Sequence, residues 1–230
     1  MLRIFDTRRY VKENEIEGEI PKYSKVSKDV MKIVWPSMVE GFLVALVTMF
    51  DGIMVSSIGN DANVAVTITK QPIYFMICFI TALNIAVTAI VSRRFGAKNR
   101  ESVNRTMHEG LKLSVMIAVV LSILVAVFSR QFCQLMGATE NTIDYATTYL
   151  SIIASGFIFN ALRLTINACQ RGIGKTKISM LTNLVANLVN IGLNYLLING
   201  NWGFPKLGIA GAAIATVIGN AVAFVICLAS

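Results

Sequence analysis

The sequence predicts an all-α integral membrane protein whose six transmembrane helices form one bundle. Its mean hydropathy is +0.63, and 55% of its 230 residues are hydrophobic, which is more apolar than a soluble domain of this size. The apolar residues come in runs of about 20–28, the length that crosses roughly 30 Å of hydrocarbon. No run alternates as a barrel strand would, and lipid requires that backbone groups be satisfied internally. These observations exclude a soluble protein with one large core.

The first expected element is a polar, charged tail over residues 1–29, followed by the bundle over residues 30–230. The tail lacks the apolar stretch of a secretory signal, so we expect it to remain as a cytosolic segment. Connections rich in Gly, Asn and charged residues separate the helices. The expected spans are about 30–57, 66–93, 104–128, 141–168, 176–199 and 207–230.

Basic residues predict the orientation of these spans. Sixteen of the 21 Lys and Arg residues lie in the N-terminal segment, the second connection and the fourth connection. The first, third and fifth connections hold only Lys70, Arg130 and Lys206, even with the span edges counted. Because basic loops stay in the cytoplasm, we expect a multi-pass protein of the cell (inner or plasma) membrane with both termini cytoplasmic. The net charge of +8 thus indicates topology and not nucleic-acid binding, since no aromatic-rich basic face accompanies it.

Residue patterns typical of enzymes and cofactor sites are missing from the sequence. The four cysteines are isolated from one another, which predicts neither a disulfide framework nor a zinc site. The single His108 has no Cys, Asp or Ser constellation beside it, and Gly172–Thr176 copies only part of a phosphate-binding loop. We expect no enzymatic activity and no bound cofactor.

One carboxylate stands in the outer half of the first span. Asp51 lies within the apolar run from Gly41 to Val55, where an acid costs about 2.5–3.5 kcal/mol to insert. It must face protein or water, where it can bind a cation or exchange a proton. Glu40 lies eleven residues earlier on nearly the same helix face, so both acids could line one cavity. Pro36 precedes them and either starts the helix or lets it bend.

Asparagines follow one face of the fifth span. Asn183, Asn187, Asn190 and Asn194 recur at spacings of four, three and four residues, which forms a single stripe along a helix. Amides that face lipid lose hydrogen bonds, so the stripe faces protein or a wet cavity. One interpretation is interhelical glue, at about 0.6 kcal/mol per contact. The other follows from the depth of Asn190 and Asn194, which matches that of Asp51: amide and carboxylate oxygens there could bind Na⁺ or hydrogen-bond a protonated carboxyl.

The fourth and sixth spans add further polar groups. Asn160 and Asn167 share a helix face through their spacing of seven residues. Tyr149 lies near the outer end of the fourth span, where an interfacial tyrosine is the alternative. Thr216 follows the small-residue segment 208–215 of the sixth span, a composition typical of close helix packing.

Several short segments occur in a fixed order along the chain. They are Trp35–Pro36, Phe50–Val55, Val91–Ala97, Ala146–Leu150, Gln170–Thr176, Asn187–Ile198 and Gly203–Thr216. Together they resemble the N-terminal six-helix lobe of the multidrug and toxic compound extrusion (MATE) family, from about residue 28 to the end of the chain.

The resemblance implies a secondary active antiporter that exports small organic compounds, often cationic drugs or toxins, in exchange for Na⁺ or H⁺. It implies a bend at Pro36 and a cation- or proton-coupling site on Asp51, Tyr149, Asn167, Asn190, Asn194 and Thr216. Asp51, Asn190 and Asn194 are the candidate Na⁺ ligands. Glu40, Asn160 and Asn187 are further candidates for the cavity lining. The sequence departs from the family at Asn194, where many relatives carry a second aspartate, and Glu40 has no counterpart in the family pattern.

The family places two such lobes, twelve helices in all, around a substrate cleft. We therefore expect a second six-helix lobe as partner, either a C-terminal half missing from a truncated product or another copy of this chain. The other expected partners are organic substrates and the lipid bilayer. Two alternatives stay open: a flippase for lipid-linked glycans from the same superfamily, which needs a strongly basic cavity, and a non-transporting membrane interaction module.

Overall fold

The computed structural model describes residues 23–229, so most of the expected tail over residues 1–29 lies outside the described residues. The chain divides into two units, one up to Trp35 and one from Pro36 onward. Of the first unit, the structure describes the N-terminal part of helix α1 (Tyr23–Ser56). The second unit, residues 36–229, is called the lobe below.

The described chain is all-helical. After α1 come α2 (Asn60–Gly96), α3 (Arg100–Val127), the short α4 (Ser129–Leu135), α5 (Ile143–Gly172), α6 (Thr176–Asn199), a 3-10 turn η4 (Asn201–Gly203) and α7 (Ile209–Ala229). Six of these helices, all but α4, are long and apolar enough to cross a membrane. The predicted class, an all-α protein with six membrane-spanning helices, is confirmed.

Some helix boundaries differ from those expected. The polar residues Asn60–Asn63 form the first turn of α2 and not a loop, because Gly59 makes the sharp turn alone at φ 145°, a backbone conformation that glycine tolerates. Lys70, expected at the edge of the span over 66–93, consequently lies ten residues inside α2. The sequence does not predict α4, whose seven residues are too few to cross a bilayer.

Pro36 lies inside α1, thirteen residues after Tyr23. It therefore does not start the helix, as one interpretation of the sequence had it. The ring removes one backbone hydrogen bond from the helix interior, and the bend at this residue stays a prediction.

Local sequence signals mark where helices begin and end. Asn99 caps α3 by accepting a hydrogen bond from the Ser102 backbone N–H at 2.9 Å, which satisfies one of the free N–H groups of the first turn. Gly200 ends α6 in the left-handed conformation at φ 73°, the usual helix stop at glycine.

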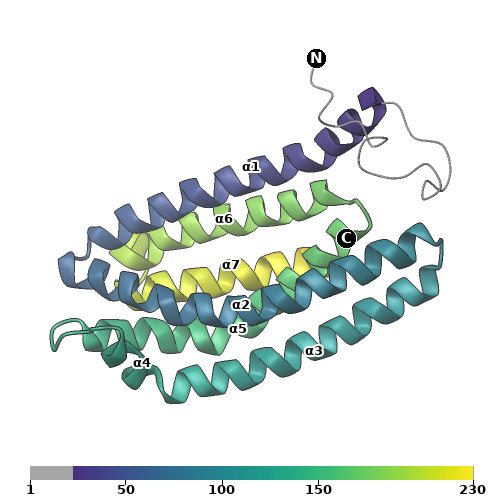
Figure 1. The fold of residues 1–230 in the computed structure, drawn as a ribbon. Helices are drawn as coiled ribbons and strands as arrows, with labels where there is room; N and C mark the ends of the chain where they lie inside the picture. Colours follow the sequence, from purple (N-terminus) through teal and green to yellow (C-terminus); the bar gives the residue numbers. More distant parts are fainter. Residues whose placement is uncertain (1–22, 230) are drawn as a thin grey trace. The chain divides into compact units, whose positions relative to one another are not determined.

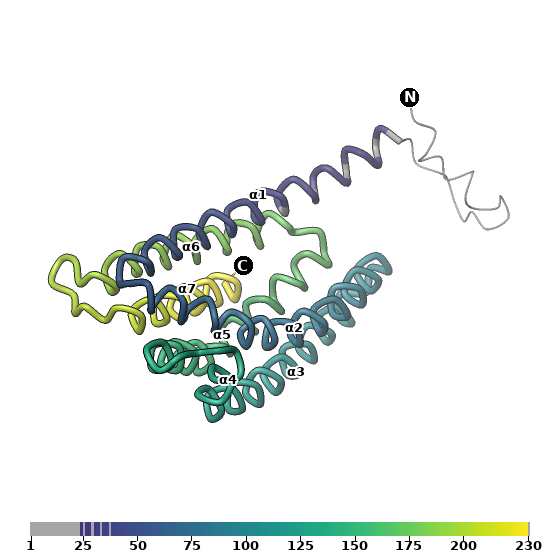
Figure 2. Tube along the Cα trace, turned by 60° about the vertical axis from the view of Figure 1, so that its left-hand side comes forward, coloured from purple at the N-terminus to yellow at the C-terminus, as the bar shows by residue number. Residues whose placement is uncertain are grey.

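Helix α5 lies at the centre of the lobe (Figures 1 and 2). It packs against α2, α3 and α7, and α7 packs in turn against α6. The core between α2 and α5 is built from fully buried Met76, Ile80, Leu150 and Phe157. We refer to the end of the lobe with the α1–α2 and α6–α7 connections as the Gly59 end. The opposite end, with the α2–α3 and α5–α6 connections, is the Lys98 end.

Candidate functional site

Asp51 of α1 is held by amides of α6. Asn194 Nδ2 donates to Asp51 Oδ1 at 2.7 Å. The amide orientation that satisfies both ends of Asn190 lets its nitrogen donate to the same Oδ1 at 2.9 Å, while its oxygen accepts from Thr216 Oγ1 of α7 at 3.1 Å. Both asparagines are buried, Asn190 at 7% and Asn194 at 2% exposure. Three helices therefore converge on one carboxylate, and two N–H donors stabilise its ionised form.

The alignment of α1 with α6 that brings Asp51 to Asn194 also places a second acid, Glu40, against α6. Asn183 Nδ2 donates to Glu40 Oε1, and the two pairs, Glu40–Asn183 and Asp51–Asn194, are each 143 residues apart. Both acids of α1 therefore meet asparagines of α6 at the same offset, about three helical turns from each other. This requires α1 and α6 to run in the same direction, as they do toward the Gly59 end (Figure 1).

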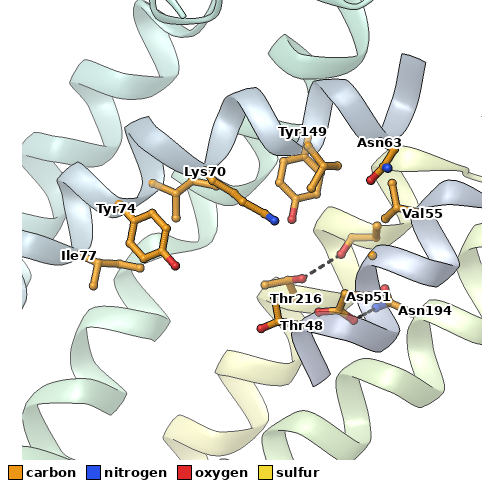
Figure 3. Close-up of a pocket in the computed structure, with 14 residues that line it drawn as sticks. Thr48, Asp51, Val55, Asn63, Lys70, Tyr74, Ile77, Tyr149, Asn194 and Thr216 are labelled. Atoms are coloured by element: carbon orange, nitrogen blue, oxygen red, sulfur yellow. Dashed lines mark hydrogen bonds between the residues drawn. The ribbon is translucent and has the colours of Figure 1, made fainter. Parts of the chain in front are cut away.

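Two cavities meet at Asp51. The first, called the α2 cavity, measures about 290 Å³ and is lined by α1, α2, Tyr149 of α5, Asn194 of α6 and α7. The second, called the α6 cavity, measures about 160 Å³ and is lined by α1, α6 and α7, including Asn187 and Asn190. Three residues line both cavities: Thr48, Asp51 and Thr216. Figure 3 shows the α2 cavity, with Asp51 and Thr216 facing Tyr149 and Lys70.

The structure brings most of the predicted site residues together. Asp51, Asn190, Asn194, Thr216 and Tyr149 line one or both of these cavities. Asn187 lines the α6 cavity, as expected of a cavity residue, and its Nδ2 is buried without a hydrogen-bond partner among the described residues.

Three other predicted residues lie elsewhere in the lobe. Asn167 is fully buried and accepts from the Cys227 thiol at 3.3 Å. It lies eighteen residues beyond Tyr149 on α5, about 27 Å along the helix. Asn160 accepts from Arg163 Nη2 at 2.9 Å. Glu40 lines neither of these two cavities, because the α6 cavity reaches from Asp51 only as far as Val44 on α1, and a shared cavity for both acids stays a prediction.

Glu40 belongs instead to a cluster of charges nearer the Lys98 end. Its carboxylate lies 3.8 Å from Arg171 Nη1, and its side chain is 17% exposed. Asn183 joins it to Arg163, whose guanidinium donates to Asn183 Oδ1. The acid of α1, the two arginines of α5 and the Asn183 amide of α6 thus link three helices, and the Arg163 Nε–H is buried without a hydrogen-bond partner among the described residues. The sequence offers no signal for this pairing, because the acid lies on α1 and both arginines lie on α5, more than a hundred residues later.

The Asp51 site can present both donors and acceptors to an ion. Asn194 Oδ1 is buried and accepts no hydrogen bond from the described residues. The amide presents its nitrogen to Asp51, and the Asp51 carboxylate and the Thr216 hydroxyl supply further hard oxygen atoms of the kind that small cations prefer. The described residues contain no group of three or more His, Cys, Asp or Glu side chains that could hold a metal, so the chemistry available here is that of one carboxylate assisted by neutral oxygens.

Lys70 is the site residue that the sequence analysis missed. It lines the α2 cavity together with Asn63, Val66, Ile73, Tyr74 and Ile77. Those six positions recur at helical spacing along one face of α2. The signal was therefore present in the sequence, since the five positions from Val66 to Ile77 already fall within the expected span over 66–93, and only Asn63 requires that α2 begin at Asn60.

Comparison with known proteins agrees with this arrangement. The MatE family model matches residues 36–196, which include α1 from Pro36 through most of α6. The chain belongs to the MATE family. It is thus a multi-pass membrane protein of a family of multidrug efflux transporters.

Individual MATE relatives show how much of a transporter the chain covers. It is 31% identical over 169 residues to "Probable multidrug resistance protein YoeA" of Bacillus subtilis, covering 74% of this chain and 36% of that relative. It is 29% identical over 203 residues to "Probable multidrug resistance protein NorM" of Thermotoga maritima, covering 87% of this chain and 42% of that relative. The chain therefore spans less than half the length of these MATE relatives.

The lobe also has the fold of a solved MATE structure. The outward-facing conformation of a multidrug resistance MATE family transporter of the MOP superfamily superposes with a TM-score of 0.81 at 24% identity, covering 87% of this chain and 44% of that one. At this identity the match shows the fold alone, and the matched share agrees with the N-terminal six-helix lobe of a MATE transporter.

Proposed function

We propose that this chain is the N-terminal lobe of a secondary antiporter that exports small organic compounds in exchange for Na⁺ or H⁺. Asp51 is the coupling carboxylate. The observation that carries the proposal is the convergence of α1, α6 and α7 on Asp51, at the boundary between two cavities. A carboxylate in the membrane that is bonded and open to a cavity has the properties required to bind and release an ion.

The coupling cycle follows from the two amides. With no ion bound, the N–H groups of Asn194 and Asn190 stabilise the ionised carboxylate. A half-turn of the Asn194 amide presents its unpartnered oxygen instead, so that Na⁺ meets the carboxylate together with the Asn194 and Thr216 oxygens. A proton on Asp51 is accommodated by the same turn, since the acid O–H needs an acceptor.

The remaining parts of the transporter are proposals of the same kind. The substrate cleft lies between this lobe and a second six-helix lobe, in the plasma membrane. Both termini of this chain face the cytoplasm, in agreement with the basic residues at the Lys98 end. A glycan-lipid flippase finds less support, because the lining of the two cavities contains one carboxylate and one ammonium among its described residues and not the basic surface that an anionic lipid carrier needs.

Gradient-driven efflux tests the proposal. The full-length transporter in proteoliposomes, with an imposed Na⁺ or H⁺ gradient, should lose coupled efflux of an organic cation in Asp51→Asn, by about tenfold or more if a charge-assisted contact is lost. Asp144→Asn is the matched control, since Asp144 is an exposed acid that pairs with Arg130 at 3.4 Å away from the site. Undiminished efflux in Asp51→Asn contradicts the assignment.

A further inference from the structure

We propose that Lys70 is a specificity-determining residue whose ammonium binds an acidic group of the exported compound. The inference rests on the proposed function and names the class of substrate that this cavity selects. It predicts that compounds with both a cationic and an acidic group bind better than compounds with a cationic group alone.

The position of Lys70 requires an aqueous surrounding. It lies ten residues into α2, about 15 Å along the helix axis from Asn60. A lysine that faced lipid at membrane depth would cost several kcal/mol, so the ammonium must reach water or a polar partner. Its side chain points into the α2 cavity, toward the side on which Tyr149 and Thr216 lie (Figure 3).

The ammonium is available to a ligand. Lys70 makes no hydrogen bond or ion pair with any residue in the described part of the chain. This contrasts with Asp51, whose carboxylate already accepts from Asn194. A lysine has three donor hydrogens, and here all three are free for a molecule that enters the cavity.

The cavity lining describes the ligand. Asp51 and Lys70 are the charged side chains among its described lining residues, so the cavity offers one negative and one positive anchor. Tyr74 and Tyr149 add aromatic walls with hydroxyl groups. Its volume of about 290 Å³ is near the lower end for small-molecule pockets. A flat compound with an amine and a carboxylate matches this lining, whereas a permanent monocation meets attraction from Asp51 and repulsion from Lys70.

A pair of rhodamine dyes tests this directly. One carries a methyl ester and is a permanent monocation; the other has the same rings with a free carboxylate and is a zwitterion. Fluorescence anisotropy measures the binding of each dye to the full-length protein in lipid nanodiscs. The ratio of the two affinities on one preparation does not depend on the folded fraction.

We expect the wild type to bind the zwitterion more tightly than the ester. Lys70→Gln should weaken zwitterion binding about tenfold, the value of one charge-assisted contact, without weakening ester binding. Lys70→Arg should retain the preference, and Lys70→Glu should reverse it. Lys112→Gln, which alters an exposed lysine paired with Glu109 on α3, should leave the ratio unchanged.

Two results overturn the inference: no binding preference in the wild type, or the same ratio in Lys70→Gln as in the wild type. The Asp51→Asn efflux measurement is separate from this ratio. If coupled efflux depends on Asp51 but the ratio of dye affinities does not depend on Lys70, the antiporter proposal stands and the role of Lys70 is refuted. If the affinity ratio depends on Lys70 but efflux does not depend on Asp51, the role of Lys70 stands and the antiporter proposal is refuted.

Discussion

Asn194 donates to Asp51 over 2.7 Å while its own amide oxygen, equally buried, accepts no hydrogen bond from the described residues. A buried carbonyl oxygen without a partner costs about 1–3 kcal/mol. When a hydrogen-bond donor or a cation binds beside Asp51, a turn of the Asn194 amide gives this oxygen a partner. One neutral side chain can serve both the empty and the occupied carboxylate.

Replacing this amide by an acid should change which ion is bound. In Asn194→Asp, two carboxylates contact each other, and two like charges at this distance do not ionise together, so the pair retains a proton near neutral pH. Na⁺ binding must then displace that proton, and the Na⁺ affinity should fall as the pH is lowered. Calorimetric titration with NaCl at several pH values measures this.

Asn199→Asp, at the exposed end of the same helix, is the control for added charge. A Na⁺ affinity of Asn194→Asp that does not vary with pH contradicts the prediction.

The Glu40 cluster should contribute to stability more than an exposed ion pair does. Glu40→Gln leaves Arg171 and Arg163 without their acid in a largely buried setting, which should cost about 1–3 kcal/mol. The exposed pair Glu109–Lys112 has side chains 58% and 72% exposed, and Glu109→Gln should cost less than about 0.5 kcal/mol. Thermal unfolding in detergent compares the two, and equal midpoints would show that the cluster adds nothing.

Close packing of α6 on α7 should not tolerate a methyl group at Gly211. A Cβ there would lie 2.6 Å from the Leu197 carbonyl oxygen, and backbone cannot move aside as a side chain can. Gly211→Ala should therefore destabilise the lobe by about 1–3 kcal/mol. Gly192 on α6 has open space around its Cβ position, so Gly192→Ala should be neutral or stabilising by up to about 1 kcal/mol. Urea or thermal unfolding measures both, and a stable Gly211→Ala would contradict the packing.

The cysteines should differ in reactivity. Cys133 is fully buried in α4, and burial raises the pKa of its thiol, so the reactive thiolate is scarce at neutral pH. Cys78 is exposed on α2. A lipid-soluble maleimide should label Cys78 first and reach Cys133 only after unfolding, as peptide mass spectrometry can determine. Equal labelling rates would place α4 differently from the fold described.

Hydropathy and charge predict much of the fold because the bilayer limits each helix to one length and one composition. The expected span over 176–199 coincides with α6. The start of α2 was less predictable, because Asn60–Asn63 continue the helix beyond the apolar run and polar residues there resemble a loop. Helix α4 carries no distinct signal, since seven residues fit neither a span nor a turn.

Part of the site could be predicted from the depth of its residues in the membrane alone. The position of Asp51 and the asparagine stripe place Asn190 and Asn194 beside it, and the structure brings the three together. The pairing of Glu40 with Arg171 could not be derived in this way. It depends on the rotation of α1 and α5 about their axes, which side-chain packing between helices determines.

The polar contacts between residues 38–56 of α1 and helix α6 have an electrical consequence. From Met38 to Ser56, Val55 is the only fully buried residue, and the carboxylates of Glu40 and Asp51 accept hydrogen bonds from asparagines of α6. Two such bonds are worth about 3–6 kcal/mol, and one elementary charge crossing 100 mV supplies about 2.3 kcal/mol. The energy of these two polar contacts between α1 and α6 is thus of the same order as the energy that one or two ions release as they cross a charged membrane.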